Sequence, residues 1–211
     1  DTGSGVSITG GALTWSSCAM GADNRVSRSI GTTLDADDWI MRFKFNVSGW
    51  NIPNQWVLGC VNTIGNPDAT TQDMIGVVVS EDYKLRLATK TDSGAYYNQG
   101  ATGDVTSAIS TDTDYYVELA RTSPTNARLR YYANADFTGQ IGSDVDVTIT
   151  SGISGLANLQ TGVQSGGSAS RTLTATLNNL QIWDSVTSVP SLSYPDLPNG
   201  TIFNETDTYK Y

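Results

Sequence analysis

The sequence predicts an all-β protein, an antiparallel β-sandwich or jelly roll of two stacked sheets. Apolar and polar residues alternate with a period of two in many short segments, which places one face of each segment in a core. Turn signals rich in Gly, Asp, Asn and Pro separate these segments. About a dozen strands at this spacing, with no helix expected to exceed one turn, are typical of a sandwich.

The clearest segment runs from Trp39 to Val47, where every odd-numbered residue is apolar. Arg42 and Lys44 lie on the opposite face, between a neutral Ile and an Asn. A turn rich in aspartate, residues 35–38, precedes the segment and sets where the strand begins. The odd-numbered face therefore belongs to the core, and the even-numbered face is either covered or lines a groove.

The other expected strands follow along the chain. Two short strands flank Gly10-Gly11, a dipeptide that suits a hairpin because glycine tolerates the positive φ of primed turns. Two further hairpins are expected, each formed by consecutive alternating segments. Their segments are 74–80 with 83–89, and 115–121 with 127–133. The remaining expected strands are 25–30, 55–61, two or three weaker strands within 142–170, and 173–183.

Length and composition favour one sandwich domain with a tail. The 211 residues suffice for a single well-buried β domain, which we expect over 1–187. Residues 188–211 begin with a Pro-rich stretch without strand alternation. We expect them to be a linker and the start of a following module or tail.

The charge of the chain excludes several partner classes. A net charge of −9 leaves no cationic face for a phosphate backbone or an anionic lipid surface. No apolar run is long enough to span a bilayer, so we expect no nucleic-acid partner and no membrane insertion. Abundant Thr, Ser and Asn, with sequons at Asn46, Asn199 and Asn204, favour an extracellular, cell-surface or virion-surface location.

The two cysteines, Cys18 and Cys60, are too few for a disulfide framework or a thiolate metal site. In an acidic chain of extracellular composition they predict one Cys18–Cys60 disulfide. The alternative is two thiols buried as small apolar side chains.

Three stretches of the sequence resemble a known superfamily. They are the turn and strand LDADDWIMRFKF, the hairpin with arginines on both sides of its turn after YYVEL, and the last strand ending in LNNLQIWD. Residues 5 to 186 are similar to the concanavalin A-like lectin/glucanase superfamily, particularly its laminin-G-like branch. The resemblance implies two stacked antiparallel sheets, one of them bent, with glycans met on the concave face or in the rim loops.

The chemistry of the side chains argues against catalysis. The chain has no histidine, which excludes Ser-His and Cys-His nucleophiles and every metal site that needs histidine. Glutamate occurs only at 81, 118 and 205, so the closely spaced acids of the resembling glucanases are absent. We expect Glu118 to pair with an arginine or lysine across the sheet. We therefore expect no enzyme, and keep polysaccharide degradation as a second alternative.

Acidic loop residues raise the possibility of a calcium site. The candidate ligands are Asp23, Asn24, Asp35 and Asp37, because hard oxygen ligands in loops suit Ca²⁺ and the resembling jelly rolls often hold one. The alternative is that Asp is a favoured turn residue, since its side chain bonds to its own backbone.

Taken together, these features predict a secreted, non-catalytic carbohydrate-binding (lectin-like) or adhesion module whose partner is a glycan or polysaccharide. The alternative is a structural module of a cell-surface or virion assembly that contacts sibling subunits. Aromatic rings stack on sugars, and arginine forks hold hydroxyl or acid groups. The expected ligand residues are Arg42, Lys44, Arg86, Glu118, Arg130 and Tyr132, rimmed by Trp50, Tyr96 and Tyr97. A purely structural role for Trp50, as a lid on the core, stays open.

Overall fold

The structure is a computed structural model of the 211-residue chain. It describes residues 5–9, 11–19, 25–51, 55–65, 72–80, 82–91, 98–104, 107–149, 152–163 and 172–189. Within these ranges every regular element is a β-strand. The strands are β1 (Val6–Thr9), β2 (Ala12–Ala19), β3 (Ser27–Ser29), β4 (Trp39–Asn51), β5 (Gln55–Val61), β6 (Met74–Val79), β7 (Leu85–Lys90), β8 (Asn98–Asp104), β9 (Asp114–Ser123), β10 (Asn126–Tyr132), β11 (Val145–Thr148), β12 (Asn158–Val163) and β13 (Thr172–Asp184).

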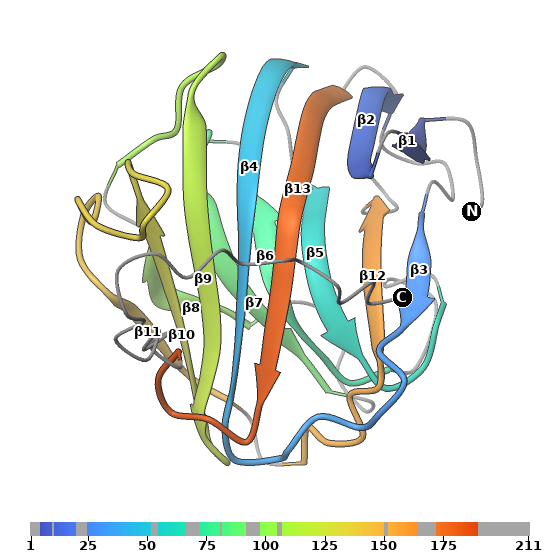
Figure 1. Ribbon diagram of the computed structural model, residues 1–211, viewed down its shortest axis with the longest axis vertical. Coiled ribbons are helices and arrows are strands. Elements are labelled where there is room, and N and C mark those ends of the chain that lie inside the picture. The colour runs from blue at the N-terminus through green and yellow to red at the C-terminus, as the bar shows by residue number, and fades with distance from the viewer. Residues whose placement is uncertain are drawn as a thin grey trace, which may run out of the picture.

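The strands form two antiparallel sheets that stack face to face (Figure 1). One sheet has seven strands in the order β1-β2-β13-β4-β9-β10-β11, and the other has six in the order β3-β12-β5-β6-β7-β8. In Figure 1 the long strands β13, β4 and β9 lie side by side in front of β5, β6 and β7. The predicted all-β sandwich is confirmed.

The predicted central strand is β4, which pairs with β13 on one side and β9 on the other. Met41, Phe43 and Phe45 are at most 1% exposed, so the odd-numbered face is in the core as expected. Arg42 and Lys44 lie on the other face and are partly exposed. Because facing residues of paired strands share a side of the sheet, this parity also decides which residues of β9 point outward.

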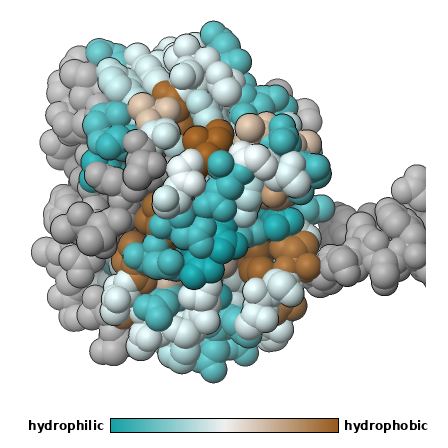
Figure 2. Space-filling view, turned by 90° about the vertical axis from the view of Figure 1, so that its left-hand side faces the viewer, coloured by the Kyte–Doolittle hydropathy of each residue, from teal (hydrophilic) through white to brown (hydrophobic). Residues whose placement is uncertain are grey.

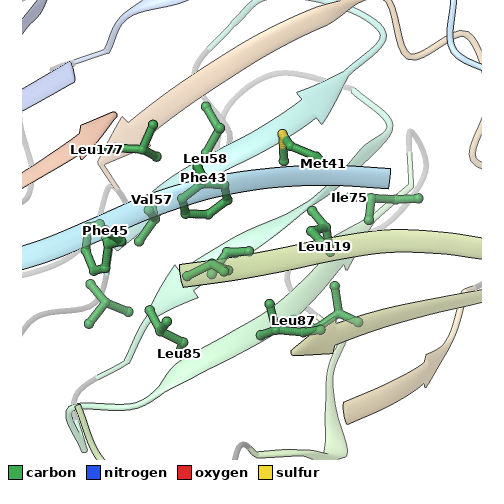
Figure 3. Packing of buried hydrophobic residues seen from close by; sticks show 14 of the residues in the cluster. Met41, Phe43, Phe45, Val57, Leu58, Ile75, Leu85, Leu87, Leu119 and Leu177 are labelled. Atoms are coloured by element: carbon green, nitrogen blue, oxygen red, sulfur yellow. The ribbon is translucent and has the colours of Figure 1, made fainter. Parts of the chain in front are cut away.

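The core lies between the sheets and is almost wholly apolar (Figure 3). Leu119 and Leu177 join the β4 residues from the seven-stranded sheet, and residues of β5, β6 and β7 meet them from the six-stranded sheet. The labelled residues of the six-stranded sheet are Val57, Leu58, Ile75, Leu85 and Leu87. Full burial of one such side chain stabilises the fold by about 1.5–3 kcal/mol, so this layer holds the two sheets together.

The expected hairpins are present. Gly11, between β1 and β2, has a φ of +79°, a conformation that glycine adopts without steric cost. The turn between β6 and β7 is closed by the Tyr83 N–H, which donates to the Ser80 carbonyl over 2.9 Å. β9 and β10 form the third hairpin, with a bulge beside Ala127.

The division of the chain at residue 187 is still a prediction. β13 ends at Asp184, and the described chain continues to Val189. Apart from its first two residues, the expected linker and tail, 188–211, lies outside the described residues.

The predicted disulfide between Cys18 and Cys60 is wrong: both residues are buried as thiols. Cys18 lies on β2 of the seven-stranded sheet, and Cys60 lies on β5 of the six-stranded sheet. Both side chains are fully buried among apolar residues of the core, where a thiol packs as a small apolar group without a bridge. The alternative, two buried thiols within the core, is what the structure has.

We expect two thiols to titrate with a disulfide reagent when the unreduced protein is denatured. In the folded protein neither should react quickly, because burial raises the pKa of Cys18 and of Cys60 to about 12 and the reactive form is the thiolate. A count of zero thiols in the denatured, unreduced protein would contradict this assignment.

Candidate functional site

The outward side of the seven-stranded sheet gathers polar and aromatic residues from four neighbouring strands. Across β4, β9 and β10, Arg42 faces Glu118, and Glu118 faces Arg130. One step along, Lys44 faces Tyr116, and Tyr116 faces Tyr132. We call this surface the outer face. Its residues are Arg42, Lys44, Asn46, Asp114, Tyr116, Glu118, Arg128, Arg130, Tyr132 and Asp146, with Phe137 and Asp144 from the adjoining loops.

Glu118 is held between two guanidinium groups at the centre of the outer face. Arg42 donates to Glu118 Oε2 from Nε over 2.8 Å and lies at 2.6 Å through Nη2. Arg130 Nη1 lies 3.4 Å from the other carboxylate oxygen, Oε1. The Glu118 side chain is only 7% exposed, so these pairs are partly desolvated. The expected ion pair of Glu118 across the sheet is therefore present, with two partners.

The ion-pair chain continues to the edge of the sheet at β10 and β11. Arg130 donates to Asp144 through Nε and Nη2 over 2.8 and 2.6 Å, and Arg128 donates to Asp146 through the same two atoms over 2.7 and 3.3 Å. The hydrogen bond from Arg130 lowers the pKa of Asp144 to about 2. Figure 2, which faces the side of the molecule formed by β10 and β11, shows hydrophilic residues across its middle between smaller apolar patches. These contacts extend the row of paired charges from Glu118 to the edge of the sheet.

Lys44 forms a separate pair on the outer face. Its Nζ lies 2.7 Å from Asp114 Oδ2, and Asn46 donates to the other oxygen of Asp114 over 2.9 Å. The hydrogen bond from Lys44 lowers the pKa of Asp114. Because Lys44 is partly exposed and Asp114 is exposed, water screens the pair, which contributes little to stability, about 0–1 kcal/mol. Its arrangement leaves an ammonium, an amide and a carboxylate close together at the surface.

An aromatic cluster covers part of this charged surface. The Phe137 ring lies 4.1 Å from Arg42 Cζ, measured to the ring centroid, and contacts the rings of Tyr116 and Tyr132 edge to face. Phe137 has a φ of +58°, which is uncommon for a bulky residue. Its N–H donates to the Asn134 carbonyl over 3.0 Å, so the turn after β10 holds the ring over the sheet.

The stack of Arg42 and Phe137 stands between two clefts. One, of about 410 Å³, is lined by Ile40, Arg42, Glu118, Arg130 and residues 187–189. The other, of about 360 Å³, is lined by Lys44, Tyr116, Phe137 and their neighbours, including residues 179–181 of β13. Each cleft thus combines ionised groups with apolar surface.

The sequence did not identify Phe137. The residue lies in a polar turn without alternation, and its only signal is a single aromatic side chain among Asn, Asp, Thr and Gly. Five expected ligand residues do lie together on the outer face: Arg42, Lys44, Glu118, Arg130 and Tyr132.

Two of the other expected ligand residues, Arg86 and Trp50, do not join them. Arg86 lies on β7 of the six-stranded sheet, where Leu85 and Leu87 occupy the inner side, so Arg86 points away from the outer face and pairs with Asp82 at 3.0 Å. Trp50 packs on the core and contacts the Tyr83 ring, with the centroids 4.7 Å apart and the planes tilted by 42°, as its alternative structural role requires. Tyr96 and Tyr97 lie outside the described residues.

The aspartates expected to bind calcium act in their own turn. Asp35 Oδ1 accepts the Asp37 N–H over 2.7 Å, and its Oδ2 accepts the Ser185 hydroxyl over 3.4 Å. Asp23 and Asn24 lie outside the described residues. In the part of the chain that the structure describes, no three acidic or cysteine side chains are grouped to hold a metal ion. Asp35 and Asp37 thus fit the turn alternative, and a calcium site that includes Asp23 and Asn24 stays a prediction.

Comparison with known proteins gives no match by sequence. No family model matches the chain, and no curated protein matches it. No helix among the described residues is long and apolar enough to cross a membrane.

Solved structures, in contrast, share the fold. Alginate lyase A1-II′ superimposes with a TM-score of 0.53 at 16% identity, covering 88% of this chain and 85% of the lyase. The exoplasmic/lumenal domain of VIP36, in its Ca²⁺/Man3GlcNAc-bound form, gives 0.52 at 10% identity, covering 89% of this chain and 84% of that domain. A Trypanosoma rangeli sialidase matches at a TM-score of 0.49 and 12% identity, and there the match covers 85% of this chain and 26% of the sialidase.

At these identities the likeness concerns the fold. The VIP36 domain and the lyase are β-sandwich jelly rolls matched over most of their length, and the two sheets with β4 and β13 at the centre of the larger one agree with that class. The chain has the β-sandwich jelly-roll fold of these solved structures.

Proposed function

We propose that the protein binds carbohydrate on the outer face and does not transform it. The observation that carries the proposal is the Arg42–Phe137 stack, which stands between two clefts lined by ionised groups. An aromatic ring offers a flat surface to the C–H face of a pyranose, and ionised groups form strong hydrogen bonds with hydroxyls. A sugar chain needs both kinds of surface side by side.

The fold agrees with the same proposal. The VIP36 domain was solved with Man3GlcNAc bound, so a sandwich of this kind can carry a glycan ligand. For a setting we propose the outside of a cell or a virion, on the basis of the sequons and the Thr-, Ser- and Asn-rich composition.

The state of the acids supports a non-catalytic role. Glycoside hydrolysis needs one carboxyl group that holds a proton and a second that is ionised, set on either side of the bond. Both oxygens of Glu118 accept from guanidinium groups, and hydrogen bonds from Lys44 and Arg130 lower the pKa of Asp114 and Asp144. All three acids are thus held in ion pairs, and the hydrogen bonds from Lys44 and Arg130 favour the ionised forms of Asp114 and Asp144.

Replacing Phe137 by Ala tests the proposal. We expect the affinity for the best-bound oligosaccharide in a panel of neutral and acidic sugars to fall by about tenfold, because the stacking surface is lost. Isothermal titration calorimetry on the 211-residue chain measures this affinity. The matched control is Tyr83→Ala, because Tyr83 is also an aromatic turn residue at positive φ, away from the outer face. The control should bind as the original protein does.

Two results would overturn the proposal. Equal affinity of the Phe137→Ala variant and the original protein would remove the outer face as the site. The absence of binding to any sugar, together with self-association in light scattering, would instead support the alternative of an assembly module that contacts sibling subunits.

A further inference from the structure

We infer that the outer face selects uncharged sugars and discriminates against uronates and sialates. This inference rests on the proposed carbohydrate binding and adds the chemical class of the ligand. It follows from how the charges of the outer face are paired.

Positive and negative groups on the described part of the outer face are equal in number. The four cations are Arg42, Lys44, Arg128 and Arg130, and the four anions are Asp114, Glu118, Asp144 and Asp146. Their sum is +4 − 4 = 0, whereas the whole chain carries −9. An acidic sugar thus meets no excess of positive charge at the outer face, and the protein as a whole repels it.

The pairing also occupies the arginine atoms that hold a carboxylate best. A guanidinium grips a carboxylate through two parallel N–H groups. In Arg128 and Arg130 the Nε and Nη2 atoms donate to both oxygens of Asp146 and Asp144, and in Arg42 the same atoms reach Glu118. A ligand carboxylate would have to displace one of these internal partners and would then lie beside the displaced anion.

A sugar hydroxyl meets no such competition, since it donates and accepts at once. Each paired carboxylate keeps lone pairs that can accept a hydroxyl proton, and each guanidinium keeps N–H groups that can donate to a hydroxyl oxygen. In the cleft beside Phe137, Lys44 adds an ammonium next to the aromatic ring surface of Tyr116. A ladder of alternating charges next to aromatic rings therefore complements a neutral pyranose chain.

A matched pair of ligands tests the inference. The 211-residue protein is titrated with β-1,4-mannohexaose and with the β-1,4-mannuronate hexamer, which differ in the oxidation of C6, and likewise with neutral and uronate forms of other linkages. In 20 mM NaCl we expect the neutral member of the best-bound pair to bind at least about tenfold more tightly. Its Kd should change by less than about twofold up to 500 mM NaCl, because no net charge is neutralised on binding.

A second test changes the net charge of the outer face by substitution. The Asp144→Asn substitution removes the carboxylate that Arg130 holds through Nε and Nη2 and that Arg128 contacts through Nε. The net charge of the outer face thereby changes from zero to +1. We expect the uronate hexamer to bind this variant about tenfold more tightly than it binds the original protein, with a clear salt dependence. The matched control is Asp82→Asn, which changes the net charge equally but removes a partner of Arg86 on the other sheet. It should leave the ligand preference unchanged.

The outcomes separate the inference from the proposal beneath it. Tighter, salt-sensitive binding of a uronate to the original protein would overturn the preference for neutral sugars and leave carbohydrate binding intact. Equal responses of the Asp144→Asn and Asp82→Asn variants would overturn the pairing argument. The absence of binding to every sugar would overturn carbohydrate binding and, with it, this inference.

Discussion

Replacing Phe43 by Ala lowers the free energy of unfolding by about 3–5 kcal/mol, the usual cost of emptying a large core position. Phe43 is 1% exposed and lies on β4, between Met41 and Phe45 on the inner face. Figure 3 shows its ring among residues of both sheets, close to Leu58 in the view. Since β4 pairs with β13 and β9, a cavity at this position weakens the contact of the sheets at the centre of the sandwich.

Urea unfolding measures this effect. The control is Ile64→Ala, because Ile64 is 46% exposed in a loop and its loss should cost less than about 1 kcal/mol. An unchanged denaturant slope would show that the variant still unfolds in one step from a similar native state. A loss below about 1.5 kcal/mol for Phe43→Ala would mean that the core is not packed as described.

Replacing Arg42 by Ala is expected to impair stability and binding together. Glu118, with a side chain 7% exposed, would keep only the 3.4 Å contact with Arg130, and loss of a partly buried ion-pair partner costs about 2–3 kcal/mol. The support of Arg42 under Phe137 would also disappear, so the affinity for glycan should fall by about 1.5–3 kcal/mol. Thermal unfolding and calorimetric titration of the same variant measure the two effects.

Glu118→Gln separates the two roles of Arg42. It removes the charge of the partner but keeps the stack of Arg42 on Phe137, so stability should fall while affinity changes less. A double-mutant cycle of Arg42→Ala and Glu118→Ala then gives the coupling energy of the pair. Equal losses of stability in the Arg42→Ala and Glu118→Gln variants, with glycan affinity unaltered in the folded fraction, would show that the ion pair is only structural.

The sequence was sufficient to predict the outer face in part, because strand alternation fixes the side on which each residue lies. The parity of 39–47 places Arg42 and Lys44 on one face of their strand, and the parity of the hairpin 115–121 with 127–133 places Glu118 and Arg130 on one face of theirs, which the structure brings together. Alternation does not say to which of two sheets a strand belongs. Arg86 has the right parity on β7, but β7 lies in the other sheet. The disulfide prediction was wrong for another reason, because it rested on the number of cysteines and the composition, and neither determines whether two buried thiols meet.

Structural features that lack an alternation of apolar and polar residues were not identified from the sequence. Phe137 owes its position to a turn at positive φ, and no periodic pattern marks a turn. β8 was not expected as a strand because Asn98–Asp104 is rich in Gly and polar residues, and it pairs with β7 through backbone hydrogen bonds that any sequence can make. The role of Trp50 was ambiguous as well, because the local sequence around a Trp beside a glycine is the same whether its ring contacts a sugar or Tyr83.

Mapping a bound neutral oligosaccharide by aromatic ¹H–¹³C NMR tests carbohydrate binding at the outer face most directly. The ring signals of Tyr116, Tyr132 and Phe137 should shift as the best-bound neutral hexasaccharide is added, because these rings form one cluster on the outer face. The signals of Trp56, which lies on β5 of the other sheet in a separate buried cluster, should stay in place. Saturable shifts confined to residues away from the outer face, with Phe137 unmoved, would contradict the account.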